Sequence, residues 1–225
     1  MNWYPSRWWR SLSARFGTLL GRRTAIIAGT DDLENFIDMR SAHVAQTALY
    51  GYLRTRAGAR FPELFANDQF VGSINIAKWQ VWLACVSDLA VYSGILLRRQ
   101  GSAPAPVVAR LMQEIIERIL IKTGIPVDAG SDFVTGAERV RSRILLCEWD
   151  VTGNDEAAFV QSPAALVQWA PVTEDLKALD EEIVRNSVRF RWHEVRRELL
   201  SGLRAESVLA AIRPMTKAPT PSSQR

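Results

Sequence analysis

Few residues in this chain could carry acid–base or nucleophilic chemistry. Its only histidines are His43 and His193, and its only cysteines are Cys85 and Cys147. A catalytic triad needs a nucleophile within hydrogen-bond reach of a histidine that an acid orients. Neither a GxSxG nor an SxxK motif supplies that nucleophile. We therefore expect no catalytic residue and expect both histidines at the edge of the core or at helix caps.

Metal-ligating patterns are equally sparse. The pair His193-Glu194 begins like an HExxH motif, but Arg197 stands where the second histidine would be. The acidic run Asp31-Asp32-Leu33-Glu34 resembles a magnesium-binding box, but acids in the first turn of a helix also complement its dipole. We favour the dipole interpretation and expect no metal and no cofactor.

One acid, Asp88, lies between Val86 and Leu89 in the most apolar stretch of the chain. A buried carboxylate must find a partner or take up a proton. Asp88 could be a functional group in a pocket or a structural hydrogen-bond anchor, and we favour the anchor. If a ligand or partner groove exists, we expect it between this helix and the last long helix, lined by Trp79, Trp82, Asp88, Tyr92, Phe190 and His193.

The elements that would position these residues are helices nearly throughout. Apolar residues recur at three- and four-residue spacing, and glycine or proline interrupts the pattern. The expected helices cover residues 30–58, 73–99, 107–123, 135–149, 162–169 and 173–202. We predict an all-α, single-domain helical bundle over residues 30–213. The polar Pro/Ser-bearing stretch 214–225 predicts a disordered tail.

The stretch from Trp79 to Leu97 has the length and the basic flanks of a transmembrane span. Gln80 and Asp88 oppose that interpretation, because an aspartate near the bilayer centre costs about 2.5–3.5 kcal/mol on insertion scales. We therefore expect a buried central helix.

The last long helix shows two sets of apolar positions. One set predicts a buried face, which a second, drifting set continues, so a broad face should be buried. Acidic residues crowd the first turns and arginines dominate the rest, as the helix dipole favours. The arginines could alternatively form a contact surface for an anionic partner. The first set is Leu176, Leu179, Ile183, Ser187 and Phe190, and the second is Val188, Trp192, Val195 and Leu199.

Residues 1–29 contain five arginines and no acidic residue. Coiled as a helix after Pro5, this segment would gather aromatic and leucine side chains on one face, with arginines mainly on the flanks. Such a helix suits an anionic membrane surface. A helix packed on the protein's own core and a cleaved organellar presequence are the alternatives. The expected membrane contacts are Trp3, Arg7, Trp8, Trp9, Arg10, Leu12, Arg15, Phe16, Leu19 and Leu20.

Charge and cysteine content limit the function further. The net charge is +4, and much of the excess lies in the first 23 residues, which argues against a nucleic-acid partner. No disulfide framework follows from two cysteines in apolar surroundings, and a reducing cytoplasm fits. We predict a cytoplasmic protein associated with the cytoplasmic face of a membrane. We expect it to be a non-enzymatic interaction or assembly factor, with an anionic membrane surface and a protein as partners.

Two blocks resemble an uncharacterised family of short helical proteins from alphaproteobacteria. They are ALYGYLRTRAGARFPELFANDQFVGSINIAKWQVWLACVSDLAVY and SPAALVQWAPVTEDLKALDEEIVRNSVRFRWHEVRREL, and they cover over a third of the chain. Some members carry the label "esterase". The resemblance implies a bacterial protein and, as an alternative function, an esterase-type hydrolase, but it supplies no catalytic residues.

Overall fold

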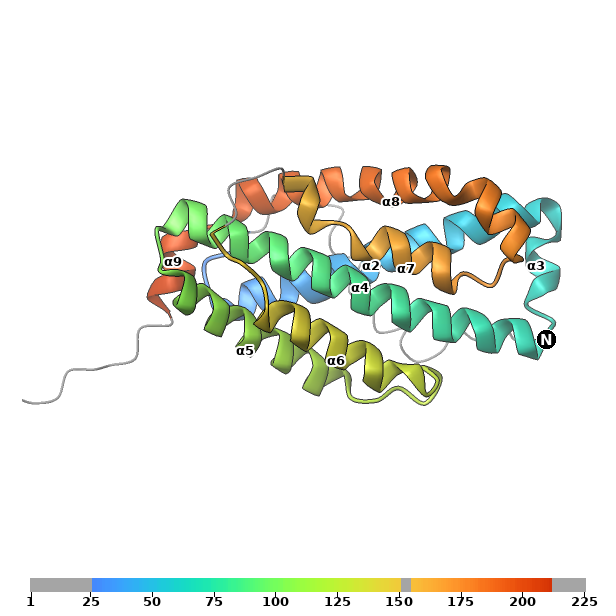
Figure 1. The fold of residues 1–225 in the computed structure, drawn as a ribbon, viewed down its shortest axis with the longest axis horizontal. Helices are drawn as coiled ribbons and strands as arrows, with labels where there is room; N and C mark the ends of the chain where they lie inside the picture. Colours follow the sequence, from blue (N-terminus) through green and yellow to red (C-terminus); the bar gives the residue numbers. More distant parts are fainter. Residues whose placement is uncertain (1–25, 151–154, 212–225) are drawn as a thin grey trace, which may run out of the picture.

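The most apolar helix, α4 (Asp68–Gly101), runs through the middle of the molecule (Figure 1). The structure is a computed structural model, and it describes residues 26–150 and 155–211. The remaining α-helices pack around α4 or cap its ends. They are α2 (Thr30–Ala57), α3 (Phe61–Leu64), α5 (Ala105–Thr123), α6 (Asp132–Leu145), α7 (Gln161–Trp169), α8 (Glu174–Gly202) and α9 (Ala205–Ala210). Two short 3-10 helices, η1 (Gly58–Arg60) and η2 (Asp155–Ala158), complete the described elements.

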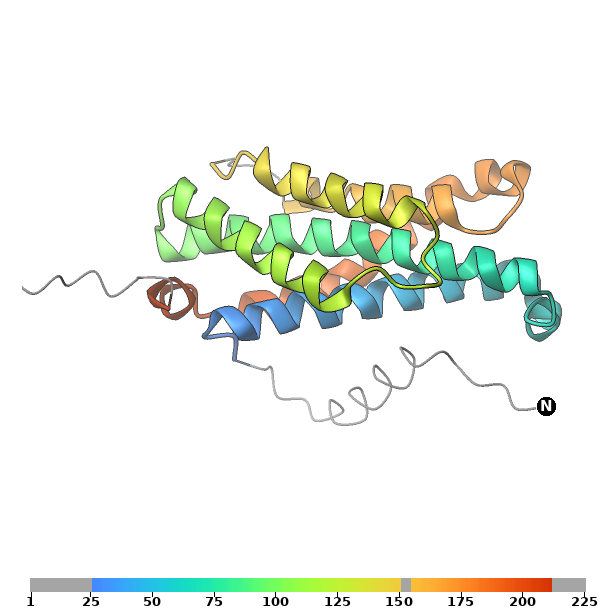
Figure 2. The ribbon, with the colours of Figure 1, turned by 90° about the horizontal axis from the view of Figure 1, so that it is seen from below.

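The long helices run roughly along the long axis of the molecule and form three layers side by side. Figure 1 shows α8 along one edge and the pair α5–α6 along the opposite edge, with α4 between them. Figure 2, seen from below, shows α2 beside α4. The prediction of an all-α, single-domain bundle is confirmed for the described residues. The expected basic N-terminal helix and the expected disordered tail lie outside them.

Helix α4 is long and apolar enough to cross a membrane by length and composition alone, but 94% of its most apolar window is buried inside the bundle. Its apolar side chains therefore form the core rather than a lipid-facing surface. The helix begins at Asp68 and not near Ser73, because Asn67 caps it by accepting a hydrogen bond from the Phe70 N–H at 3.1 Å.

Helix α8 buries only one of its two apolar sets. Val188, Trp192, Val195 and Leu199 face the core, as predicted, and Val184 joins them. The same face carries two charged residues: Lys177 pairs with the exposed Glu174, and Asp180 pairs with Arg56.

The expectation that the other apolar set of α8 is buried was wrong. Leu179, Ile183 and Phe190 are exposed by 77%, 73% and 75%. The reason is geometric: the inner set repeats at four-, four-, three- and four-residue spacing against α2 and α7, and a helix between two neighbours cannot also bury its outer side. We call Leu179, Ile183 and Phe190 the outer stripe.

The two ends of the described bundle meet in one short parallel bridge. The Ile27 N–H donates to the Gly202 carbonyl at 3.0 Å, and the Arg204 N–H donates to the Ile27 carbonyl at 2.9 Å. This bridge fixes the entry to α2 beside the junction between α8 and α9. Residues 1–25 therefore join the body at the C-terminal end of α8.

Trp149 lies beyond the end of α6, although the sequence placed it on that helix. Its ring lies directly on α4 at Gly94, where an added Cβ would be 2.0 Å from the ring. Only glycine leaves room for this contact, which fastens the chain after α6 to the central helix.

Replacing Gly94 with alanine should therefore lower the free energy of unfolding by about 1–3 kcal/mol, because the methyl group displaces the Trp149 ring. Gly72 is a matched control in the same helix, since nothing lies within 4 Å of its added Cβ. Gly72→Ala should raise the free energy of unfolding by about 0.5–1 kcal/mol. Urea unfolding measures both. Equal effects of the two substitutions would contradict the placement of Trp149.

Candidate functional site

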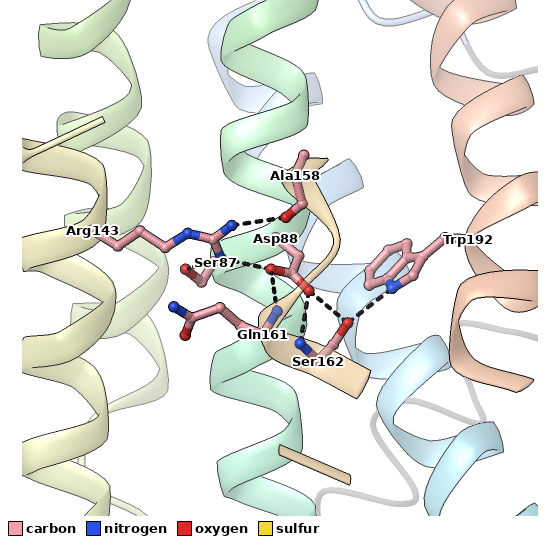
Figure 3. Close-up of polar contacts among 7 residues, drawn as sticks. All are labelled: Ser87, Asp88, Arg143, Ala158, Gln161, Ser162 and Trp192. Atoms are coloured by element: carbon pink, nitrogen blue, oxygen red, sulfur yellow. Dashed lines mark hydrogen bonds and ion pairs between the residues drawn. The ribbon is translucent and has the colours of Figure 1, made fainter. Parts of the chain in front are cut away.

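A buried polar cluster joins four helical segments at the centre of the molecule. Asp88 comes from the middle of α4, Arg143 from the last turn of α6, Ser162 from the first turn of α7 and Trp192 from α8 (Figure 3). We call these residues the Asp88 cluster. Asp88 is fully buried, so its charge has no access to bulk water.

Every contact to the Asp88 carboxylate comes from a donor. Oδ1 accepts from Arg143 Nη1 at 2.6 Å and from the Gln161 backbone N–H at 3.1 Å. Oδ2 accepts from the Ser162 backbone N–H at 2.7 Å and from Ser162 Oγ at 2.6 Å. Each carboxylate oxygen therefore accepts two hydrogen bonds, which fills the acceptor positions of the group.

Asp88 also caps a helix to which it does not belong. Gln161 and Ser162 open α7, and the first backbone N–H groups of a helix have no partner within that helix. Val160, at the cap position, offers no side-chain acceptor. The Asp88 carboxylate takes over this role and places a negative charge at the positive end of the helix dipole.

Ser162 is held in one orientation by its neighbours. Trp192 Nε1 can only donate, and it donates to Ser162 Oγ at 2.9 Å, so the hydroxyl hydrogen is directed to Asp88. A nucleophilic serine instead needs a base that takes its proton. Ser162 thus acts as a link between α8 and Asp88.

Burial raises the pKa of Asp88, while the Arg143 guanidinium and the hydrogen bonds from Ser162 oppose this rise. Arg143 is itself anchored, because Nη2 donates to the Ala158 carbonyl at 2.8 Å and Nη1 also reaches Ser87 Oγ at 3.1 Å. Burial likewise raises the pKa of the Cys85 thiol well above its ordinary value, so this thiol stays neutral. The cluster ties helices together and offers no free acid, base or nucleophile.

The structure places the six residues of the expected groove in two different surroundings. Trp79, Trp82, Asp88 and Tyr92 are buried in the core, where the two tryptophan rings meet edge-on at 5.7 Å. Phe190 and His193 lie exposed on the outer side of α8. The structure therefore does not bring the two sets together.

The two histidines do share a groove, between α2 and α8. It has a volume of about 670 Å³ and is lined by His43 and Arg40 of α2 and by His193, Glu194 and Glu198 of α8, among others. Arg40 Nε lies 2.8 Å from Glu198 Oε2 across the groove. The residues come from positions 40–47 and 190–198, so no local pattern could reveal their proximity.

Burial, together with Arg40 and Arg191, lowers the pKa of His43, so its imidazole is neutral at pH 7. A neutral imidazole could act as a base, but the nearby Thr47 hydroxyl already donates to the His43 carbonyl at 2.8 Å. Among the described residues that line this groove, none is a serine or a cysteine. The groove thus resembles a polar contact surface more than a hydrolase centre.

The described part of the chain holds no group of three or more His, Cys, Asp or Glu side chains placed to bind a metal ion. Comparison of the chain with protein-family models, with curated proteins and with solved structures finds no match.

Sequence reasoning identified Asp88 but missed its partners, Arg143 and Ser162. Arg143 lies 55 residues from Asp88 and Ser162 lies 74 residues from it. One usable signal was present, because the helix that starts near Ser162-Pro163 has an apolar residue, Val160, where a capping side chain is usual.

Asp88→Asn should lower the free energy of unfolding by about 3–5 kcal/mol, because it leaves the Arg143 charge unpaired and turns an amide N–H toward the donors of α7. Asp150 provides the matched control. It pairs with Arg98 at 2.8 Å but is 68% exposed, so Asp150→Asn should cost less than about 1 kcal/mol. Urea unfolding compares the two. A small loss in Asp88→Asn would show that the cluster does not hold the bundle together.

Proposed function

We propose that this protein is a non-enzymatic interaction or assembly factor held on the cytoplasmic face of a membrane by residues 3–23. The observation that carries the proposal is the bridge between Ile27 and the chain at residues 202–204. Through this bridge the basic, tryptophan-rich segment leaves the body at the arginine-rich end of α8. The N-terminal segment and the arginine-rich end of the bundle can then bind the same anionic surface.

Charge near this junction has one predominant sign. Residues 185–206 contain six arginines and three glutamates, and Glu198 is already paired with Arg40. Arg197 and Arg204 are exposed. Each basic residue close to an anionic lipid surface contributes about 1 kcal/mol of attraction.

Acidic residues at the start of α2 oppose the positive charge near the junction, but basic side chains of α5 lie against some of them and reduce this effect. Arg118 Nε lies 2.9 Å from Glu34, and Lys122 Nζ lies 3.9 Å from Asp38. Arg118 and Lys122 therefore offset part of the negative charge at this end of α2, while arginines outnumber glutamates over residues 185–206.

The outer stripe of α8 supports the second half of the proposal, a protein partner. Leu179, Ile183 and Phe190 follow one another at four and seven residues, so they lie on one face. Large exposed apolar side chains grouped in this way mark interaction surfaces. Asp175 and Glu182 flank the first half of the stripe, so a partner helix with an apolar face and basic edges would fit it.

The geometry favours this proposal over the esterase alternative. Ser162 lies 2.6 Å from a carboxylate that accepts its proton as a hydrogen bond, and Thr47 is bonded to the backbone. Hydrolysis through a covalent intermediate requires a hydroxyl that a base can deprotonate in reach of substrate. Both hydroxyls instead serve the fold.

The full-length protein should sediment with vesicles that contain phosphatidylserine, and less of it should sediment as the salt concentration rises. Removal of residues 1–23 should abolish most of the sedimentation. In the full-length chain, Arg204→Glu should weaken it because Arg204 lies where the segment leaves the body. Quantified co-sedimentation measures all three effects.

Arg60→Glu is the matched control, because Arg60 is 81% exposed and lies beside α3, at the end of the bundle opposite α9 (Figure 1). It should leave sedimentation nearly unchanged. Equal sedimentation of the full-length and shortened proteins, each with an intact helical circular dichroism spectrum, would refute the membrane role. Equal effects of Arg60→Glu and Arg204→Glu would refute the role of the α8 end.

A further inference from the structure

A small pocket of about 240 Å³ opens between α4, α6 and α7. It is separate from the groove with the histidines and borders the Asp88 cluster at Gln161, whose backbone N–H binds Asp88. We call it the Gln80 pocket. Its polar lining consists of Gln80 from α4, Arg139 from α6, and Gln161 and Gln168 from α7.

Small residues create this space. Ala84, Ala164 and Ala165 line it from α4 and α7, where larger side chains would fill it. On the α6 side stands Gly136, where an added Cβ would lie 2.7 Å from Leu83 and 3.0 Å from Gln80 Oε1. The close approach of α6 therefore leaves no room for a side chain at position 136 beside the Gln80 amide.

Gln80 is the feature that points to a ligand. Its side chain is 5% exposed, and its Nε2 has no hydrogen-bond partner within the described chain. Buried polar groups are almost always satisfied, so an unpaired amide that lines a pocket calls for an acceptor. The acceptor that is missing from the protein would come from a bound molecule.

The rim indicates the charge of that molecule. Arg139 is exposed, and its one hydrogen bond within the described residues goes to the Thr135 carbonyl of its own helix, at 3.4 Å. The described part of the chain contributes no acidic side chain to the lining of the pocket. One uncompensated guanidinium suits a single negative charge, and guanidinium bonds to a carboxylate are charge-assisted. A phosphate, with its larger charge, would need more cations than this pocket provides.

The size and the remaining walls indicate the rest of the molecule. At the roughly 30 Å³ that a water occupies in the liquid, the pocket has room for about eight heavy atoms. Val140 and Trp169 offer apolar surface beside the polar groups. This volume lies below the usual range of pockets for drug-sized ligands, so the ligand is a small one.

We propose that the Gln80 pocket binds a small organic monocarboxylate. The carboxylate accepts a hydrogen bond from Gln80 Nε2 at the buried end and is attracted by Arg139 at the rim, and its short apolar part lies against Val140 and Trp169. This inference is independent of the proposed membrane role, because it rests on α4, α6 and α7 alone.

The full-length, isotope-labelled protein can be titrated with sodium butyrate and sodium benzoate, with butyramide as the neutral comparison. Both carboxylates should shift the Gln80 side-chain amide and the Trp169 indole signals saturably, and butyramide should bind at least about tenfold more weakly. Arg139→Gln should weaken carboxylate binding by a similar factor, and Ala164→Leu should abolish it by filling the pocket. Arg110→Gln, at an exposed arginine of α5, should leave it unchanged.

Gln80→Leu distinguishes a ligand group from a structural one. Because it replaces an unpaired buried amide, it should raise the melting temperature of the free protein, and it should remove the rise that butyrate gives the wild type. If neither carboxylate shifts the Gln80 signals, the pocket holds solvent only and the proposal fails. It fails equally if Gln80→Leu lowers the melting temperature and still binds butyrate.

Discussion

The bundle depends on the burial of one negative charge. A carboxylate removed from water at the centre of α4 must be surrounded by donors, or the cost of its desolvation is not offset. In this protein the donors come from three other segments: Arg143 at the end of α6, and the backbone and hydroxyl of α7, with Trp192 of α8 bound behind Ser162. A single side chain thus links α6, α7 and α8 to one point on α4.

In this arrangement the Asp88 cluster in the interior holds the fold together, and surface features are available for binding. The polar groups of the Asp88 cluster hold helices together, and the Asp88 carboxylate accepts no further hydrogen bond. Apart from the Gln80 pocket, the features available for binding lie at the surface: the outer stripe of α8, its exposed arginines and the junction from which residues 1–25 depart. An interaction protein fits this division, because a rigid bundle can present an apolar stripe and a basic end in a fixed relation to each other.

The order of apolar residues, glycines and prolines along the chain predicted where helices end and which helix is central. The ends of α2 and α5 follow from Gly58 and Gly124, which close those helices at positive φ, and the sequence also indicated that the apolar stretch of α4 is core. Periodicity could not tell which apolar side of α8 faces inward, because both sides repeat at helical spacing and the choice depends on α2 and α7. The partners of Asp88 and the lining of the Gln80 pocket were equally inaccessible, since they come from helices far apart in the chain.

The most direct test of this account is amide hydrogen exchange at the start of α7. The backbone N–H groups of Gln161 and Ser162 occupy first-turn positions, which exchange quickly in most helices because no carbonyl of the same helix binds them. If Asp88 caps α7 from α4, both amides exchange as slowly as those in the middle of α4, and Asp88→Asn speeds up their exchange far more than that of the α2 amides. Rapid exchange of both amides in the wild-type protein would contradict the account.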